Sequence, residues 1–214
     1  MKAKKQVMIL YLLLLFTGIS GCKAVVPQAR ETKAQIQNPQ RDWQKISGKG
    51  VVLELPQNYF GGNPQTEIEE ITTKLKAVAP SYEENIAKIK QNSQAIALLA
   101  FDSNSAPESF LTNVNITTDK SVPDETIEDY LERFTTQLSS LYRIQDQKLI
   151  SVEDYQAGRI VAQTEVDQTE IKQLFYTIKN DDTFWIVTYA TTAEQFEQRL
   201  PSFEQSMRTL KIGS

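Results

Sequence analysis

The segment from residue 155 to residue 191 constrains the fold most, because it reads as three consecutive β-strands. Short polar turns at residues 167–170 and 180–183 separate these strands. Apolar side chains occupy both alternating sets of the last strand: Phe184 and Ile186 on one face, and Trp185, Val187 and Tyr189 on the other. A strand that is apolar on both faces must be covered on both sides. We therefore expect an α+β fold in which an antiparallel meander forms the centre of a sheet with helices on both faces.

Three further strands are expected outside the meander. Residues 51–55 alternate between apolar and polar, as a half-buried strand does, and residues 95–101 form the continuous apolar run of a buried strand. Residues 144–152 form another expected strand. Residues 57–62 contain two glycines, and we expect a loop there, which either makes a tight turn or contacts a ligand.

The first two predicted helices lie between residues 63 and 93. Asn63 followed by Pro64 is typical of a helix start, and Pro80 ends this helix. A second, short helix follows, for which Ser81 and Glu84 have the spacing of a capping box. Apolar residues at helical spacing support both helices.

Two more helices are expected later in the chain. Residues 121–143 give the longest helical pattern, with Ser121 and Asp124 as its expected cap. The last helix starts after Thr192, which we expect to cap it. Pro201 lies inside this pattern, and we expect it to split the helix.

Polar residues share one face of an alternating segment at residues 110–118. Asn113, Asn115 and Thr117 make this face polar enough to be solvated or to line a groove. We take Asn113 and Asn115 as candidate binding residues. Arg159 is a third candidate, since its guanidinium could pair with a carboxylate of a partner or be a surface charge. It follows Gly158, where a glycine within a strand suggests a β-bulge.

The first 22 residues have the pattern of a bacterial lipoprotein signal peptide. Three lysines among the first five residues precede an apolar run at residues 7–16, which is shorter than the ~20 residues of a membrane-spanning helix. Cys22, the only cysteine, follows Ile19-Ser20-Gly21 and so resembles the end of a lipobox. By that resemblance Cys22 becomes the mature N-terminus and carries a diacylglyceryl group, with acylation, for example by palmitate, at its amine. The alternative is a short N-terminal membrane helix with an incidental cysteine.

These features divide the chain into three parts. We expect a signal peptide at residues 1–21, the lipidated Cys22 with a flexible tether at residues 22–42, and a globular domain at residues 43–214. A diacylglyceryl group supplies the two acyl chains that stable membrane attachment needs. The tether is rich in glutamine and has two prolines, and a linker of this length reaches about 25 Å. The net charge of −4 argues against a nucleic-acid partner.

The available residue types limit the chemistry. The chain has no histidine, which removes the commonest general base and the commonest metal ligand. The segment at residues 102–105 (DSNS) offers only part of a calcium-loop pattern. Adjacent acidic pairs, Glu69 with Glu70 and Asp181 with Asp182, point in different directions on a helix or strand. A Ser–Lys dyad stays open, although no S-x-x-K occurs in the domain. We expect no enzymatic activity, no metal and no cofactor.

Four sequence motifs together resemble the PsbP/DcrB/Mog superfamily. They are Leu55-Pro56 with Tyr59, Tyr155 with Ala157-Gly158, the aromatic segment at residues 183–189, and the closing helix at residues 203–210. The similarity covers about residues 43–212 and is greatest to lipoproteins of cyanobacterial type. It implies an α-β-α sandwich, no enzymatic chemistry, and a role as an extrinsic or assembly-type binding module. In the photosynthetic branch of the family the partner is photosystem II.

We therefore expect a lipid-anchored extracytoplasmic protein that binds or assembles a membrane protein complex, such as photosystem II, without catalysis. Its expected partners are membrane lipid, through diacylglyceryl Cys22, and that membrane protein complex. The membrane is a plasma, outer or thylakoid membrane. Two other classes of function stay open: a small-ligand carrier that uses a groove beside Asn113 and Asn115, and a hydrolase with a carboxylate site.

Overall fold

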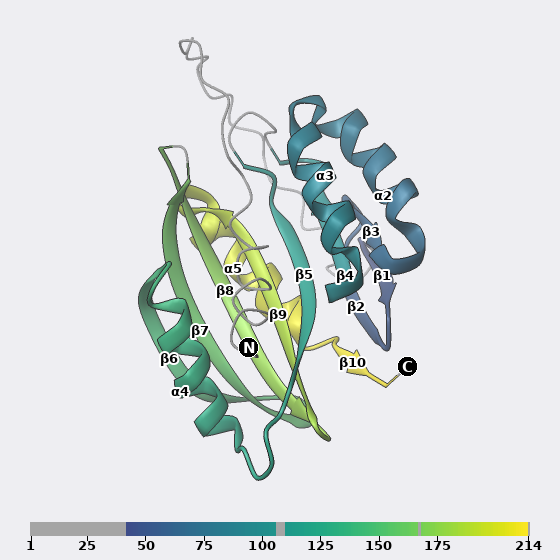
Figure 1. Cartoon of the computed structure of the whole chain (residues 1–214). Helices are drawn as coiled ribbons and strands as arrows, with labels where there is room; N and C mark the ends of the chain where they lie inside the picture. Colours follow the sequence, from purple (N-terminus) through teal and green to yellow (C-terminus); the bar gives the residue numbers. More distant parts are fainter. Residues whose placement is uncertain (1–41, 106–109, 167, 214) are drawn as a thin grey trace.

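The computed structural model describes residues 42–105, 110–166 and 168–213 (Figure 1). The predicted signal peptide, Cys22 and nearly all of the predicted tether lie outside these residues. Within the described ranges, no helix combines the length and the apolar character that crossing a membrane requires.

Strands make up most of the described elements, and helices connect or cover them. The strands are β1 (Trp43–Gly48), β2 (Val51–Pro56), β3 (Tyr59–Gly62), β4 (Ile96–Asp102), β5 (Asn113–Lys120), β6 (Arg143–Val152), β7 (Tyr155–Val166), β8 (Thr169–Asn180), β9 (Thr183–Thr192) and β10 (Lys211–Ile212). The α-helices are α2 (Pro64–Val78), α3 (Glu83–Asn92), α4 (Ile127–Leu138) and α5 (Ala193–Met207). Short 3₁₀ turns lie at Pro80–Tyr82 and Ser93–Ala95.

The strands form two antiparallel sheets. The large sheet has the order β3-β4-β5-β9-β8-β7-β6, and the small sheet has the order β1-β2-β10. The predicted meander is confirmed as β7, β8 and β9, which pair with one another in sequence. Helix α4 lies between β5 and β6 in the chain, so it carries the chain from the middle of the large sheet to the β6 edge. The meander then returns strand by strand until β9 pairs with β5.

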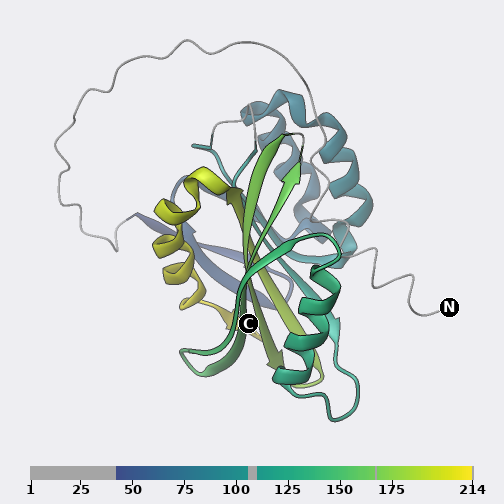
Figure 2. The same ribbon diagram turned by 90° about the vertical axis from the view of Figure 1, so that its left-hand side faces the viewer.

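Helices cover both faces of the large sheet, as the sequence predicted. On one face, which we call the α5 face, α5 and the small sheet share a core with the meander (Figure 2). On the opposite face, α2 packs on β3 and β4 with α3 beside it, and α4 packs on β6, β7 and β8 (Figure 1). We call this second side the α4 face. The α+β fold class is therefore confirmed.

The alternation along β9 explains why both faces need cover. Phe184 points to the α4 face, where its ring stacks on Tyr130 of α4 with ring centroids 3.8 Å apart. Tyr189 points to the α5 face and stacks on Phe203 of α5 at 4.9 Å. Each of these aromatic rings is buried, and aromatic side chains bury the largest apolar areas of any residues. The strand therefore anchors one helix on each side of the sheet.

The loop predicted at residues 57–62 is confirmed only for residues 57–58, which form a turn, and is wrong for Tyr59–Gly62, which forms the edge strand β3. A Cβ atom at Gly61 would collide with the backbone of β4 at Leu99 and Ala100. Gly61 therefore permits a close approach between two strands and does not make a turn.

Two predicted helix starts are also wrong. Ser81 and Glu84 form no capping box, because residues 80–82 make a 3₁₀ turn and α3 begins at Glu83 without a side-chain cap. Helix α4 begins at Ile127, and Thr126 with Asp129 forms its capping box in place of the expected Ser121 cap. Asp124 has a φ of 62°, in the left-handed region, so a helix cannot run through it.

Pro201 does not split the last helix, since α5 runs from Ala193 to Met207 with Pro201 inside it. Phe196 and Phe203, on either side of Pro201, are both buried in the core of the α5 face. Their packing holds both halves of the helix on the sheet and outweighs the backbone hydrogen bond that proline removes. Thr192 occupies the N-cap position, but its side chain makes no capping hydrogen bond.

The expected β-bulge at Gly158 is wrong. The irregularity between β6 and β7 lies instead at Ile144 and Asp146. A Cβ atom at Gly158 would lie 2.5 Å from the Thr177 Oγ1 atom and 2.7 Å from a methyl carbon of Leu131. Glycine is therefore needed at this position because α4 packs closely on β7.

We predict that Gly158→Ala lowers the free energy of unfolding by about 1–3 kcal/mol, because the added methyl overpacks the contact between α4 and β7. Urea unfolding followed by circular dichroism measures the change. The same substitution in a Leu131→Ala background should cost less, since a neighbour of the new methyl is then gone. An equal cost in both backgrounds would mean that α4 does not lie against Gly158.

Candidate functional site

A set of uncharged polar side chains lies on the α4 face of the large sheet. We call this set the polar strip, and its members are Asn113, Asn115 and Thr117 of β5, Thr188 of β9 and Gln173 of β8. Strand register fixes their side of the sheet. Asn115 pairs with Leu99, which packs with the residues of α2, and Thr188 pairs with Phe175, which packs with those of α4. Residues that pair across strands point to the same face.

Strand register also sets the rows of the polar strip. Asn115 and Thr188 are direct neighbours across β5 and β9. In the next row, Asn113 and Gln173 stand on either side of the small Ala190. The strip therefore lies between the strands that α2 covers and those that α4 covers (Figure 1).

The polar strip is buried. Asn113, Asn115 and Thr117 are 5–7% exposed, and Thr188 is fully buried. The solvated alternative for this face is therefore wrong. A sheet face that is shielded from water is usually apolar, so these buried amides and hydroxyls require hydrogen-bond partners.

The polar strip contains hydrogen-bonding groups that the described chain leaves unpaired. The Asn113 side-chain amide donates to the Leu111 carbonyl at 3.0 Å. The Thr188 hydroxyl and the Gln173 carbonyl oxygen have no hydrogen-bond partner among the described residues. Each such buried group costs about 1–3 kcal/mol of stability. On the opposite face, by contrast, the buried hydroxyls of Thr112 and Thr191 pair at 2.8 Å.

Aromatic side chains lie at the meander side of the strip. The Tyr142 ring meets the Phe175 ring edge-on, with centroids 5.9 Å apart. Burial raises the pKa of the Tyr142 hydroxyl above its ordinary value, and the neighbouring Gln173 side chain opposes the rise. The hydroxyl therefore stays protonated and can donate a hydrogen bond. Phe110 packs with Ala190 at the end of the strip where β5 begins.

A charged cluster lies beyond the other end of the strip. Asp119 follows Thr117 by two residues on β5, and the Arg133 guanidinium lies 3.5 Å from its carboxylate. Arg133 also contacts Glu125, with an Nε to Oε1 distance of 2.8 Å. Burial alone would raise the pKa of Glu125, but its hydrogen bonds to Arg133 and to the Val122 amide outweigh burial and leave this pKa below its ordinary value. These charged side chains pair with one another beyond the end of the strip, whose own residues are all uncharged.

Arg159 does not lie with Asn113 and Asn115. It pairs with Tyr176 across β7 and β8, which places it on the α5 face. Its guanidinium lies between two carboxylates, 2.7 Å from Asp146 and 3.3 Å from Glu204. Its side chain is only 8% exposed, so its surface-charge interpretation is wrong. The partners of this arginine within the domain are Asp146 of β6 and Glu204 of α5.

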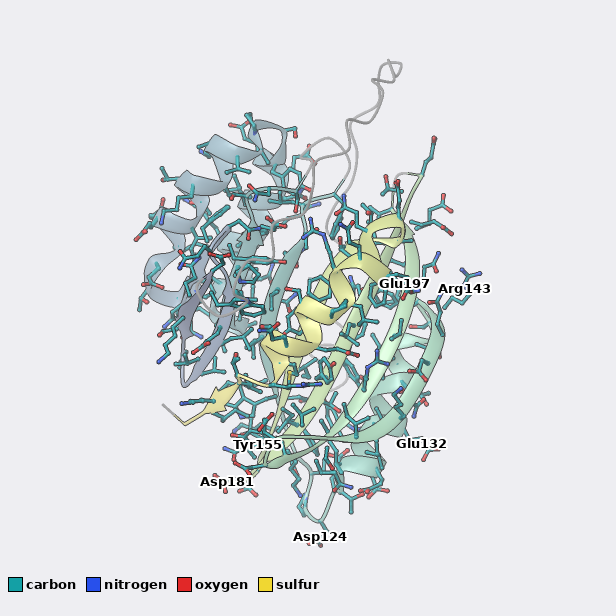
Figure 3. All side chains as sticks on the ribbon, turned by 180° about the vertical axis from the view of Figure 1, so that it is seen from behind. Asp124, Glu132, Arg143, Tyr155, Asp181 and Glu197 are labelled. Carbon is teal, nitrogen blue, oxygen red and sulfur yellow. The ribbon has the colours of Figure 1, made fainter. Side chains whose placement is uncertain are left out.

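The acidic residues that the sequence analysis singled out lie apart from one another and from the polar strip. Asp102, from the predicted partial calcium pattern, accepts hydrogen bonds from Asn58, from the Asn104 amide and from Arg199 of α5. Glu69 and Glu70 form separate ion pairs with Lys90 and Lys74. Figure 3 places Asp124, Glu132, Asp181 and Glu197 at separate points on the outside of the domain. Within the described ranges, no three His, Cys, Asp or Glu side chains form a possible metal site.

An open hollow of about 600 Å³ lies where the turn between β6 and β7 meets the C-terminal end of the described chain. Charged residues of both signs line it, among them Glu54, Asp154, Arg208 and Lys211. Because charges of both signs line this open hollow, it offers little basis for the selective binding of one ligand. The polar strip, with buried unpaired groups, is the stronger candidate site.

Sequence reasoning found the β5 part of the strip and missed the rest. The alternation at residues 110–118 identified Asn113 and Asn115 as a shared polar face. Thr188 and Gln173 lie in strands that are distant in sequence, and only the pairing of β9 with β5 and β8 places them beside the asparagines. A polar residue at an otherwise apolar position of a central strand was the available signal for Thr188.

Comparisons with known proteins identify the fold. No protein-family model matches the chain, and no curated protein matches it. LpqN of Mycobacterium tuberculosis, described as involved in cell envelope biogenesis, matches with a TM-score of 0.52 and 8% identity over 80% of this chain and 91% of its own. CyanoP, the cyanobacterial PsbP of Synechocystis sp. PCC 6803, matches with a TM-score of 0.51 and 10% identity over 85% of this chain and 98% of its own. The chain therefore has a PsbP-like α+β fold.

The burial of Arg159 leads to a prediction about stability. Replacing both carboxylates, by Asp146→Asn with Glu204→Gln, should lower the free energy of unfolding by about 2–4 kcal/mol, because a buried guanidinium loses both its anions. Arg159→Met should cost less, about 1–2 kcal/mol, because the two carboxylates it releases are 42% and 41% exposed and stay solvated. Urea unfolding at pH 7 measures both. The reverse order of costs would contradict a buried Arg159.

Proposed function

We propose that this protein is an envelope-associated accessory protein that binds another component outside the cytoplasm and performs no chemistry of its own. The observation that carries this proposal is the polar strip: a set of buried, uncharged side chains in which the Thr188 hydroxyl and the Gln173 carbonyl oxygen have no partner among the described residues. Each buried polar group without a partner calls for an explanation, such as a bound water or a functional role. We propose that a bound partner supplies the missing hydrogen bonds.

The placement of the charged residues supports a binding role over a hydrolase. General acid–base catalysis needs carboxylates or other titratable groups that meet at one point with shifted pKa values. The two buried carboxylates of the described chain are each paired with an arginine: Asp102 binds Arg199, and Glu125 binds Arg133. Residues of the polar strip carry no charge, so they suit hydrogen bonding and not proton transfer.

The N-terminal sequence and the fold together support a membrane-attached location. Residues 1–22 resemble a lipoprotein signal peptide that ends at Cys22. The chain also shares its fold with LpqN, which is involved in cell envelope biogenesis, and with a cyanobacterial PsbP. A tether of about 20 residues would let the domain reach about 25 Å from the bilayer. We propose a membrane protein complex as the partner, with photosystem II as the example from the PsbP branch.

The lipid anchor can be tested by labelling. Cells that express the full-length protein are fed an alkyne-bearing palmitate, and the purified protein is examined for the label and for the mass of its N-terminal peptide. We expect label and a diacylglyceryl mass on Cys22, and neither in Cys22→Ser. Ser20→Ala is the matched control and should keep both, because it retains a small residue before the cysteine. An unlipidated Cys22 in the wild-type protein would overturn the anchoring part of the proposal.

Affinity capture tests the partner. The lipidated protein is used to capture complexes from membranes solubilised in a mild detergent, and Asn115→Leu serves as the comparison. One membrane protein complex captured by the wild type and reduced with Asn115→Leu would support a binding role for the polar strip. Equal capture by both proteins would exclude the strip as the binding surface. Capture of no complex would contradict the accessory role.

A further inference from the structure

Strand β6 leaves one long edge of the large sheet free. It is ten residues long, and within the described ranges β7 is the one strand that pairs with it. It runs along the outer margin of the sheet, where Figure 3 labels Arg143 at its start. Helix α4 contacts β6, β7 and β8, so it covers their common face and not the outer edge. The main-chain N–H and C=O groups of such an edge are available to another strand.

The opposite edge of the large sheet offers much less to a partner. Its strand β3 has only four residues, and the Gln44 side chain of β1 already donates to the Tyr59 carbonyl at 2.5 Å and to the Gln57 carbonyl at 2.9 Å. Strand β6, by contrast, carries Leu149, which is 38% exposed although most large apolar side chains of the described chain are buried. The edge of β6 is therefore the longest uncovered strand edge of the domain.

The charges of β6 are complementary to those of a second β6. Asp146, Gln147 and Lys148 are a negative, a neutral and a positive side chain in succession. If a second copy of β6 runs antiparallel with Gln147 opposite Gln147, each Asp146 lies opposite Lys148 of the other copy. Opposite charges that face each other directly across two strands stabilise the pair. A glutamine suits the two-fold axis, because its amide both donates and accepts hydrogen bonds.

Other antiparallel registers lose these contacts. A two-fold axis at Lys148 would place lysine opposite lysine, and one at Asp146 would place aspartate opposite aspartate, and like charges directly opposite destabilise a strand pair. An axis at Leu149 would place Lys148 opposite Ile150 and gain no ion pair. Arg159 donates to the Oδ2 atom of Asp146, but this carboxylate remains partly exposed and can also face a lysine. The charges therefore select the register centred on the glutamine.

Two features of β6 restrict which strand can pair with it. A lysine or a β-bulge on an edge strand usually hinders pairing with another chain. The bulge of β6 lies between Ile144 and Asp146, so residues 146–152 pair regularly with β7 and present a regular edge. Lys148 repels a strand that has no acidic residue opposite it, and a second copy supplies that residue. Repulsion of other strands adds to the specificity for a second copy.

We propose that this protein forms a dimer with a second copy of itself through antiparallel pairing of β6, with the two-fold axis at Gln147. The two large sheets then join into one, and Asp146 and Lys148 form two reciprocal ion pairs across the new strand pair. This inference goes beyond the proposed accessory function, because it names a second surface. The polar strip on β5, β9 and β8 is separated from β6 by β7 and stays outside the dimer interface.

Cysteine cross-linking tests the register. Gln147→Cys and Leu149→Cys are made in the full-length protein and oxidised in neutral detergent micelles, and the wild type, whose one cysteine is Cys22, gives the background. Directly opposite residues have Cα atoms about 4.5–5.5 Å apart, which a disulfide can span. We expect a disulfide-linked dimer from Gln147→Cys. Leu149→Cys should give only background, because its two copies would lie about 14 Å apart. Equal cross-linking of both variants, or none with Gln147→Cys, would overturn the proposal.

Sedimentation equilibrium in density-matched detergent tests the ion pairs. Lys148→Gln removes the cation of both pairs and should raise the dimer Kd about 2- to 30-fold. Lys76→Gln makes the same change of net charge on α2, which packs at the other end of the sheet, and should leave the Kd unchanged. Both lysines are exposed, so neither substitution alters the core. A wild type that stays monomeric at every concentration, or equal Kd values for the two variants, would contradict the β6 interface.

Discussion

Two-sided burial of the meander formed by β7, β8 and β9 is the constraint on which the rest of the domain depends. Alternate residues of these strands enter separate cores, so Phe184 contacts α4 while Tyr189 contacts α5. Neither core can form unless a helix covers that face of the sheet. The route of the chain follows from this requirement, because α4 carries it across one face before the meander starts and α5 covers the other face after the meander ends.

The polar strip lies where this apolar pattern is interrupted. α2 packs on one part of the α4 face and α4 on another, and Asn115 and Thr188 are neighbours on the strands between these parts. Buried polar groups that stay unpaired lower stability, so each one calls for an explanation. This chain has the same fold as LpqN and CyanoP. Within that fold, the strip places buried, uncharged polar side chains between the two helix-covered parts of the sheet.

Local patterns in the sequence were enough to predict the meander, the helices on both faces and the shared face of Asn113 and Asn115. Each depends on alternation within a few residues. Contacts between distant segments were not predictable in this way. Gly61 was assigned to a loop because the close approach of β4 to β3 is not encoded nearby, and Pro201 was expected to split a helix that tertiary packing holds together. The position of Thr188 beside Asn115 depends on the pairing of β9 with β5, which the local sequence does not indicate.

The most direct test of this account is the thermal unfolding of Thr188→Val beside Thr191→Val. Both threonines are fully buried on β9, but only the Thr191 hydroxyl has a partner, Thr112 at 2.8 Å. Removing an unpaired hydroxyl removes an uncompensated desolvation cost, so we expect Thr188→Val to raise the Tm by about 2–4 °C. Thr191→Val should lower the Tm by a similar amount, because Thr112 loses its hydrogen bond. If Thr188→Val lowers the Tm as Thr191→Val does, the Thr188 hydroxyl is already satisfied within the protein, and the polar strip loses an unpaired group on which its proposed role rests.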